Sequence, residues 1–431
     1  MDVNDVALRR CREILLEEGP CGDDAPAAAP PENPREEDKV LTGTGLLRGG
    51  LAEENILRAE TLRMMGGEFD DYAAEYVAST VLPKTRMLRV VDLADTRITP
   101  VGLRTLLRAL EQSPTEVLEQ LSFRDMHLHA EACDLVCRVM LKHTARLRRL
   151  ELERCHVDET AAQAVAEGIA KAGALVEARL AGNDFIPAFA IPLEEPRWLF
   201  FPPSLKLLDL SGNRIQTVHQ RGLYVSLSRC AASLEELYLS RCCVTESALT
   251  GILRVGIHSS HSLRVLNVSS GRLLHTAGKV LCSFLTECSN LERLYARDNL
   301  IEADGAAHMA LGIPCAKRLT VLGLGSCHLS GVGARVIAEA VNHSPSLREL
   351  DLSNNSVTDA DVVDICAHGG DGSLQLSFLD LSDNPLSERC RPALEAMMGR
   401  NNVGTCTVLV RGTTLGSEFS YLQCGGSQDR L

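Results

Sequence analysis

A frame of apolar residues returns along most of this chain at an almost constant spacing. Its form is L-x-x-L-x-L-x-x-(N/C)-x-L, and a clear copy starts at Leu205 and ends at Ile215. Successive copies begin 28 to 30 residues apart. Their first residues are Leu88, Leu118, Leu147, Leu175, Leu205, Leu234, Leu263, Leu291, Leu319, Leu347, Leu376 and a degenerate Thr405. This regular spacing predicts a stack of about twelve similar structural units.

Each part of the frame has a structural role. The alternating leucines predict a short parallel strand in which every second residue is buried. The Asn or Cys at position 9 stands where the chain turns away, so its side chain can bond backbone groups that the turn leaves unpaired. Residues after the turn, as in 102–110 and 331–341, show the apolar spacing of an amphipathic helix. One such unit cannot bury its apolar faces alone, but a stack can.

The scarcity of aromatic residues agrees with this architecture. The 431 residues include only 1 Trp, 6 Tyr and 9 Phe. Three conventional globular cores, which the length alone would suggest, need more buried volume than these side chains supply. A thin core of Leu, Ala and Val between strands and helices needs few aromatic rings.

The repeats resemble the ribonuclease-inhibitor-like class of leucine-rich repeats. The resemblance rests on the period, on the helix in each unit, and on the mixture of Cys (Cys155, Cys242, Cys327) and Asn (Asn183, Asn213, Asn299, Asn355, Asn384) at the turn. It implies an α/β fold, a horseshoe-shaped leucine-rich-repeat solenoid with a parallel sheet on the concave side and helices outside. It implies little about function, which is grafted onto such folds.

The chain is expected to divide into four regions. Residues 1–50 read as an acidic helix and a flexible linker, and residues 51–86 as a helical cap on the first repeat. Residues 87–415 form the solenoid, and residues 416–431 form a short polar tail. Residues 1–86 contain 10 Lys and Arg against 18 Asp and Glu, so most of the net charge of −13 lies outside the solenoid.

One repeat departs from the pattern. The stretch 185–203 follows Asn183, where a helix is due, but its prolines forbid a regular helix. It also contains five of the aromatic residues: Phe185, Phe189, Trp198, Phe200 and Phe201. These rings either fill the space of the missing helix or form an exposed docking patch, with Trp198, Phe200 and Phe201 as the contact residues.

A second candidate surface lies on the strands of repeats six to eight. The residues that flank the strand leucines change there from small or acidic to Tyr and Arg, types that are enriched in binding hot spots. The candidate protein-binding residues are Tyr238, Arg241, Asn267, Arg293, Tyr295 and Arg297. The alternative is a self-paired ladder, for instance Arg293 and Arg297 with Glu236 and Asp298. A smaller mixed patch comprises Arg149, Glu151, Glu153 and Arg179.

Motifs that carry chemistry are missing from the sequence. It has no phosphate-loop motif, no G-x-S-x-G, no H-E-x-x-H and no C-x-x-C pair. We therefore expect no enzymatic activity, cofactor, metal or small-molecule substrate. The negative charge argues against nucleic acid as a partner, and no apolar run reaches membrane-spanning length. The first residues lack a secretory signal, so we expect the scattered cysteines to be free thiols in the cytoplasm.

These observations favour a non-enzymatic scaffold for protein–protein interaction, in the cytosol or on the cytoskeleton. Repeat proteins of this class also serve as subunits of ciliary and flagellar assemblies such as the dynein regulatory complex. This resemblance implies that the partner of such a scaffold could belong to the axoneme. Two alternatives remain: a small-GTPase regulator resembling Ran GTPase-activating protein, and an enzyme inhibitor that acts through the concave face.

Overall fold

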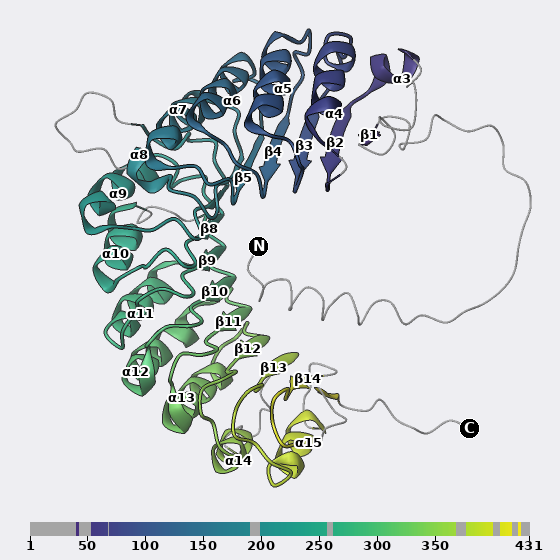
Figure 1. Ribbon diagram of the computed structural model, residues 1–431. Coiled ribbons are helices and arrows are strands. Elements are labelled where there is room, and N and C mark those ends of the chain that lie inside the picture. Colours follow the sequence, from purple (N-terminus) through teal and green to yellow (C-terminus); the bar gives the residue numbers. More distant parts are fainter. Residues whose placement is uncertain are drawn as a thin grey trace, which may run out of the picture. The chain divides into compact units, whose positions relative to one another are not determined.

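The computed structural model describes residues 40–42, 53–67, 69–189, 199–256, 262–367, 376–399, 406–415 and 421–423. The chain divides into two units, Met1–Asp38 and Lys39–Leu431, and all described residues belong to the second. In that unit the strands line the inner side of an arc and the helices cover its outer side (Figure 1). The expected leucine-rich-repeat solenoid is confirmed.

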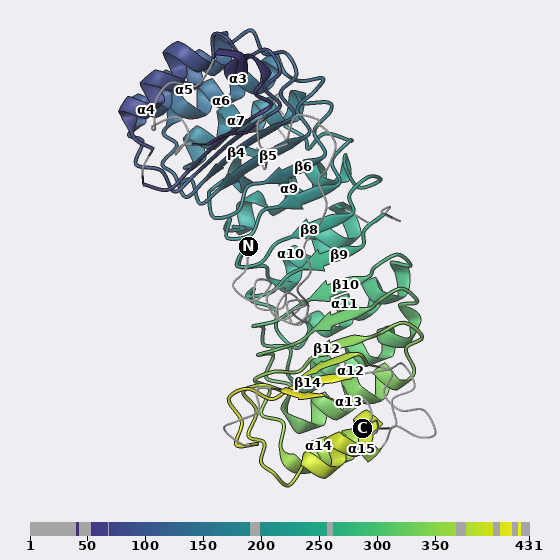
Figure 2. The same cartoon turned by 90° about the vertical axis from the view of Figure 1, so that its right-hand side faces the viewer.

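The strands of this unit form a single sheet in chain order, from β1 to β15, and the turned view shows them following one another along the stack (Figure 2). Neighbouring strands from β1 to β14 are parallel, and β15 is antiparallel to β14. The strands are β1 Val40–Thr42, β2 Thr61–Met65, β3 Val90–Ala94, β4 Gln120–Arg124, β5 Arg149–Glu153, β6 Glu177–Arg179, β7 Leu207–Asp209, β8 Glu236–Tyr238, β9 Val265–Asn267, β10 Arg293–Tyr295, β11 Val321–Gly323, β12 Glu349–Asp351, β13 Phe378–Asp380, β14 Thr407–Leu409 and β15 Tyr421–Gln423.

A helix follows the turn in nearly every repeat and shields the apolar side of the sheet. The α-helices are α3 Glu53–Arg58, α4 Asp71–Tyr76, α5 Pro100–Gln112, α6 Ala130–Lys142, α7 Glu159–Lys171, α8 Ile186–Phe189, α9 Gln220–Ser228, α10 Glu246–Gly251, α11 Ala277–Glu287, α12 Glu302–Gly312, α13 Ser330–Asn342, α14 Asp359–Ala367 and α15 Arg391–Gly399. Several begin with a side-chain cap, such as Asp158, whose carboxylate accepts the Ala161 N–H at 2.8 Å.

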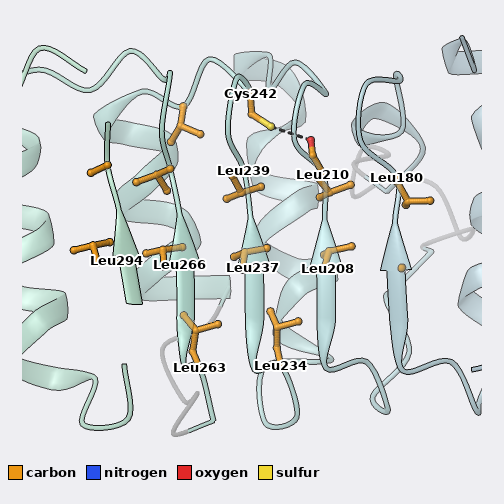
Figure 3. Packing of buried hydrophobic residues seen from close by; sticks show 14 of the residues in the cluster. Leu180, Leu208, Leu210, Leu234, Leu237, Leu239, Cys242, Leu263, Leu266 and Leu294 are labelled. Atoms are coloured by element: carbon orange, nitrogen blue, oxygen red, sulfur yellow. Dashed lines mark hydrogen bonds between the residues drawn. The ribbon is translucent and has the colours of Figure 1, made fainter. Parts of the chain in front are cut away.

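The core is built from columns of leucines that run through the stack. Leu208, Leu237 and Leu266 occupy the same frame position in successive strands, and all three are fully buried (Figure 3). The strand register keeps each frame position beside its equivalent in the next repeat, so one leucine packs on the next. The buried cysteines join this core as small apolar residues. The cysteines that the structure describes are free thiols.

The side chains at frame position 9 pair backbone groups between repeats, as the sequence predicts. Asn355 accepts the N–H groups of Cys327 and Leu329 at 3.0 and 3.1 Å, and its amide donates to the Leu324 carbonyl at 2.8 Å. Cys242 donates its thiol to the Leu210 carbonyl with an S···O distance of 3.0 Å (Figure 3). An Asn therefore satisfies donors and acceptors, whereas a Cys satisfies mainly a carbonyl.

Frame position 8 has a left-handed backbone in every repeat, which the sequence reasoning missed. The φ angles lie between 50° and 73°. The residues are Asp95, Asp125, Arg154, Gly182, Gly212, Arg241, Ser270, Asp298, Ser326, Asn354, Asp383 and Gly412. Gly, Asp and Asn tolerate this region best, and their recurrence at one position is the signal that could have found it.

Strands of the sheet also lie outside the expected solenoid range 87–415. Residues 51–86 are not purely a helical cap, because β2 lies within them and β1 precedes them in the same sheet. In β2, Leu62 and Met64 alternate with exposed side chains, a strand pattern that short apolar runs do not distinguish from a helix. At the other end, β15 lies inside the stretch expected to be a polar tail and extends the sheet.

Candidate protein-binding surface

The inner face of the sheet between β8 and β10 brings together several of the predicted binding residues. Strand register places Tyr238 beside Asn267, and Asn267 beside Tyr295. Arg293 lies on the same face two residues before Tyr295, because alternate residues of a strand point to the same side. The structure therefore joins Tyr238, Arg293 and Tyr295 into one surface, which we call the inner-face surface.

The members of the inner-face surface differ in how freely they meet solvent. Both tyrosines are half-buried, and the Tyr238 hydroxyl donates to Glu236 Oε2 at 2.7 Å. The Arg293 side chain is exposed and has no ion-pair or hydrogen-bond partner among the described residues. Part of this surface is thus self-paired, while its arginine is available to a ligand.

Asn267 does not contribute a contact group, contrary to expectation. Its side chain is only 9% exposed, and its Oδ1 accepts the Ser269 N–H at 3.0 Å. The same bond recurs in other repeats, where Asp209 accepts from Ser211 and Asp351 accepts from Ser353. Position 5 of the frame therefore caps the end of the strand in these repeats, which explains why so many acidic residues there are buried.

Arg297 is committed to an ion pair inside the protein. Its Nη1 lies 2.6 Å from Asp351 Oδ2, and its Nη2 donates to the Ser353 hydroxyl at 3.3 Å. Asp351 is on β12, so the arginine crosses the intervening repeat. It can do so because that repeat has Gly323 and Gly325 at the two facing positions. A Cβ atom on Gly325 would stand 2.5 Å from the Ser353 hydroxyl and 2.9 Å from Asp351.

This ion pair lies in a poorly hydrated part of the face. Burial raises the pKa of Asp351, and the nearby Arg297 opposes that rise. The partner differs from the Asp298 that the sequence suggested, because Asp298 sits at the left-handed position of the turn and Asp351 on a strand. Arg297 therefore makes a structural ion pair, and its role as a partner contact stays a prediction.

Arg241 is exposed but stands apart from the strand residues. It occupies the left-handed position of the turn after β8, with φ of 57°. The structure thus assigns it to the edge of the sheet and not to the inner face.

The aromatic segment mostly fills the space of the missing helix. Among the residues that the structure describes between Asn183 and β7, the four-residue α8 is the helix that follows Asn183. Phe185, Phe189 and Phe201 are buried. The rings of Phe189 and Phe201 stack with centroids 4.1 Å apart. Phe201 is therefore a core residue, and its prediction as a docking contact is wrong. Phe200 is half-buried beneath the Arg229 guanidinium, 4.6 Å from its ring centroid, and Trp198 lies outside the described residues.

The smaller mixed patch on β5 and β6 is neutralised by its own ion pairs. Arg149 Nε lies 3.1 Å from Glu177 Oε1, and Arg179 Nε lies 3.6 Å from Glu151 Oε1. Glu153, also predicted for this patch, is buried. This part of the face thus offers little unpaired charge to a ligand.

Features of catalysis or metal binding are not seen in the described part of the chain. Its His, Cys, Asp and Glu side chains do not form a group of three or more that could hold a metal ion. Burial raises the pKa of Cys155 and Cys327 to about 12, so these thiols stay protonated and unreactive. Among the described residues, no helix is long and apolar enough to span a membrane.

Comparison with known proteins agrees with the repeat architecture. A family model described as "Leucine Rich repeat" matches residues 85–107 and 343–366. Ribonuclease inhibitor of Sus scrofa is 27% identical over 74% of this chain and 76% of its own length. The chain thus has the leucine-rich-repeat fold and is similar to ribonuclease inhibitor.

Other relatives of this leucine-rich-repeat protein are larger. "NACHT, LRR and PYD domains-containing protein 3" of Mus musculus is 24% identical over 74% of this chain, a match that spans only 30% of that protein. The solved structure of an internalin from Listeria monocytogenes superposes with a TM-score of 0.47 at 13% identity, over 86% of this chain and 87% of that one. That superposition is too loose to carry an argument about function.

Proposed function

We propose that this leucine-rich-repeat protein is a non-enzymatic interaction scaffold that binds a partner protein through the inner-face surface. The observation that carries the proposal is Arg293, an exposed arginine without an internal partner, on the same strand face as the half-buried Tyr295. Tyr and Arg supply large contact area and directional donors, and both are enriched in binding hot spots. An extended sheet face suits a protein ligand better than a small molecule, which needs a concave pocket.

The test compares two doubly substituted chains in partner capture from the native source. Arg293→Glu with Tyr295→Ala changes the inner-face surface. Arg146→Glu with Tyr72→Ala is the matched control, because both of its residues are exposed and neither lies on the strands β8–β10. We expect crosslinked partners to be lost with the first variant and kept with the second. Equal recovery with both would refute the inner face as the binding site.

The kind of assembly is part of the same proposal. We propose a structural or regulatory subunit of a cytosolic or cytoskeletal complex, including an axonemal one, which the repeat class favours only by resemblance. Localisation of a fluorescently tagged chain before and after detergent extraction tests this. A signal that the detergent removes completely would refute the cytoskeletal version.

Enzyme inhibition through the inner face is a second candidate, because a ribonuclease inhibitor is similar over 74% of this chain. Adding the purified chain to a ribonuclease assay tests it directly. Inhibition that Arg293→Glu with Tyr295→Ala abolishes would favour this candidate over the scaffold. The small-GTPase regulator stays a prediction, and a GTP-hydrolysis assay with candidate GTPases tests that one.

A further inference from the structure

The turns that follow strands β7–β10 form a second surface at the edge of the sheet. Arg214 and Arg272 occupy frame position 10 of repeats five and seven, and Arg241 occupies position 8 of repeat six between them. All three side chains are exposed. Backbone hydrogen bonds hold these turns together: Ile215 N–H donates to the Cys242 carbonyl and Arg272 N–H to the Val244 carbonyl, each at 2.9 Å. We call this the rim surface.

Two arginines of the rim surface, Arg214 and Arg272, lack within the described part of the chain the ion pairs that several arginines on the strands make. Arg124 on β4, for example, is neutralised by Asp92 at 2.8 Å. Arg214 and Arg272 have no carboxylate within ion-pair distance among the described residues. Equivalent turn positions carry Asp184 before this stretch and Asp298 after it. Arg214, Arg241 and Arg272 thus place positive charge on three successive repeats between these two acidic residues.

Apolar side chains on the same turns also face solvent. Val218 is 76% exposed, Leu274 is 49% exposed and Leu300 is 44% exposed. Leu274 and Leu300 come from neighbouring repeats and form a parallel backbone bridge, so they lie side by side. Exposed apolar residues on the same turns as exposed arginines are typical of a surface that binds another protein.

We propose that the rim surface, made of Arg214, Arg241, Arg272, Val218, Leu274 and Leu300, docks an extended acidic segment of a partner protein with apolar residues between its carboxylates. Stacked repeats are about 5 Å apart, so Arg214 and Arg272 are separated by about 10 Å along the stack. An extended chain advances about 3.3 Å per residue, so carboxylates two to three residues apart match that separation. The excess of arginine selects an acidic ligand, and this site lies apart from the inner-face surface.

The experiment selects ligands without assuming their identity. A phage-displayed library of random peptides is panned against the full-length chain, and selected peptides are measured by fluorescence anisotropy. Three variants are compared: R214E/R241E/R272E, R293E/Y295A, and the control R86E/R146E/R318E. The control reverses three exposed arginines that precede the strand frames and have no ion-pair partner among the described residues. It therefore matches the change in net charge without touching the rim surface.

We expect the selected peptides to be rich in Asp and Glu with interspersed Leu, Ile or Phe. Their affinity should fall at least about tenfold in R214E/R241E/R272E, stay within about twofold in the control, and weaken with added salt. Substituting Val218, Leu274 and Leu300 with serine should weaken it as well. Failure to enrich any peptide, enrichment of basic or neutral peptides, or equal loss in the control would overturn the proposal. Loss only in R293E/Y295A would also overturn it, while supporting the inner-face surface.

Discussion

Replacing Arg297 with methionine tests whether the ion pair of this arginine stabilises the fold. The substitution keeps most of the apolar volume but removes the ion pair with Asp351 and the hydrogen bond to Ser353. The carboxylate of Asp351 then remains in a site where its side chain is only 9% exposed. The substitution thus leaves the buried Asp351 carboxylate without its ion-pair partner and changes little else.

The size of the effect follows from this burial. Breaking a buried pair by removing one partner costs about 3–5 kcal/mol. Because the Arg297 side chain is 18% exposed, we expect the low end, about 3 kcal/mol of unfolding free energy. The pKa of Asp351, already raised by burial, should rise further without the arginine. A carboxyl whose pKa is higher in the folded state favours folding at low pH, so the penalty should shrink as the pH falls below 7.

Urea unfolding followed by far-UV circular dichroism, at several pH values between 7 and 5, measures both quantities. Arg297→Met with Asp351→Asn is the rescue variant, since it removes the stranded charge and should recover most of the loss. A loss below about 1 kcal/mol for Arg297→Met at pH 7 would refute the structural role of the ion pair. So would a penalty that does not depend on pH.

Three further perturbations test the repeat architecture itself. Leu237→Ala should lower the unfolding free energy by about 2–5 kcal/mol, because it opens a cavity in a fully buried leucine column. A loss smaller than about 2 kcal/mol, measured by urea denaturation, would contradict this packing. Asn355→Ala should cost about 2–4 kcal/mol, since it leaves the buried Cys327 and Leu329 N–H groups unpaired, and increased amide hydrogen exchange in that turn would report the cause. Burial, together with the positive charge of the neighbouring Lys142, lowers the pKa of His143 to about 4. The unfolded chain therefore binds a proton at His143 more readily than the folded chain does. The unfolding free energy should fall by about 2–3 kcal/mol as the pH drops from about 6.5 to about 4. His143→Gln should flatten this part of the stability–pH curve, and an unchanged curve would exclude His143 as its source.

The candidate binding surface shows where sequence reasoning succeeds and where it stops. Alternation along β10 correctly placed Arg293 and Tyr295 on one face, because that relation depends only on strand geometry. The same reasoning could not separate Arg293 from Arg297, although both are arginines beside one strand. Their difference depends on Asp351, which lies two repeats away, and on the absence of side chains at Gly323 and Gly325 between them.

The aromatic segment gives the same lesson in the core. Its prolines predicted the loss of a regular helix, and in the described part of this segment the helix is the four-residue α8. Which rings would be buried could not be read from composition, because Phe200 and Phe201 are neighbours in sequence with opposite environments. Stacking with Phe189 buries Phe201, whereas Phe200 meets Arg229.

The sequence by itself determined the repeat, its period, the leucine columns and the role of Asn and Cys at the turn. It could do so because each unit contacts mainly itself and its two neighbours, so the local pattern contains nearly all the information that the stack requires. Only the tertiary structure decided which inner-face charges are paired, that Arg241 belongs to the rim, and that the sheet continues through β1 and β2. Those features depend on side chains that meet across repeats, where the identity of each residue is free to vary without disturbing the frame.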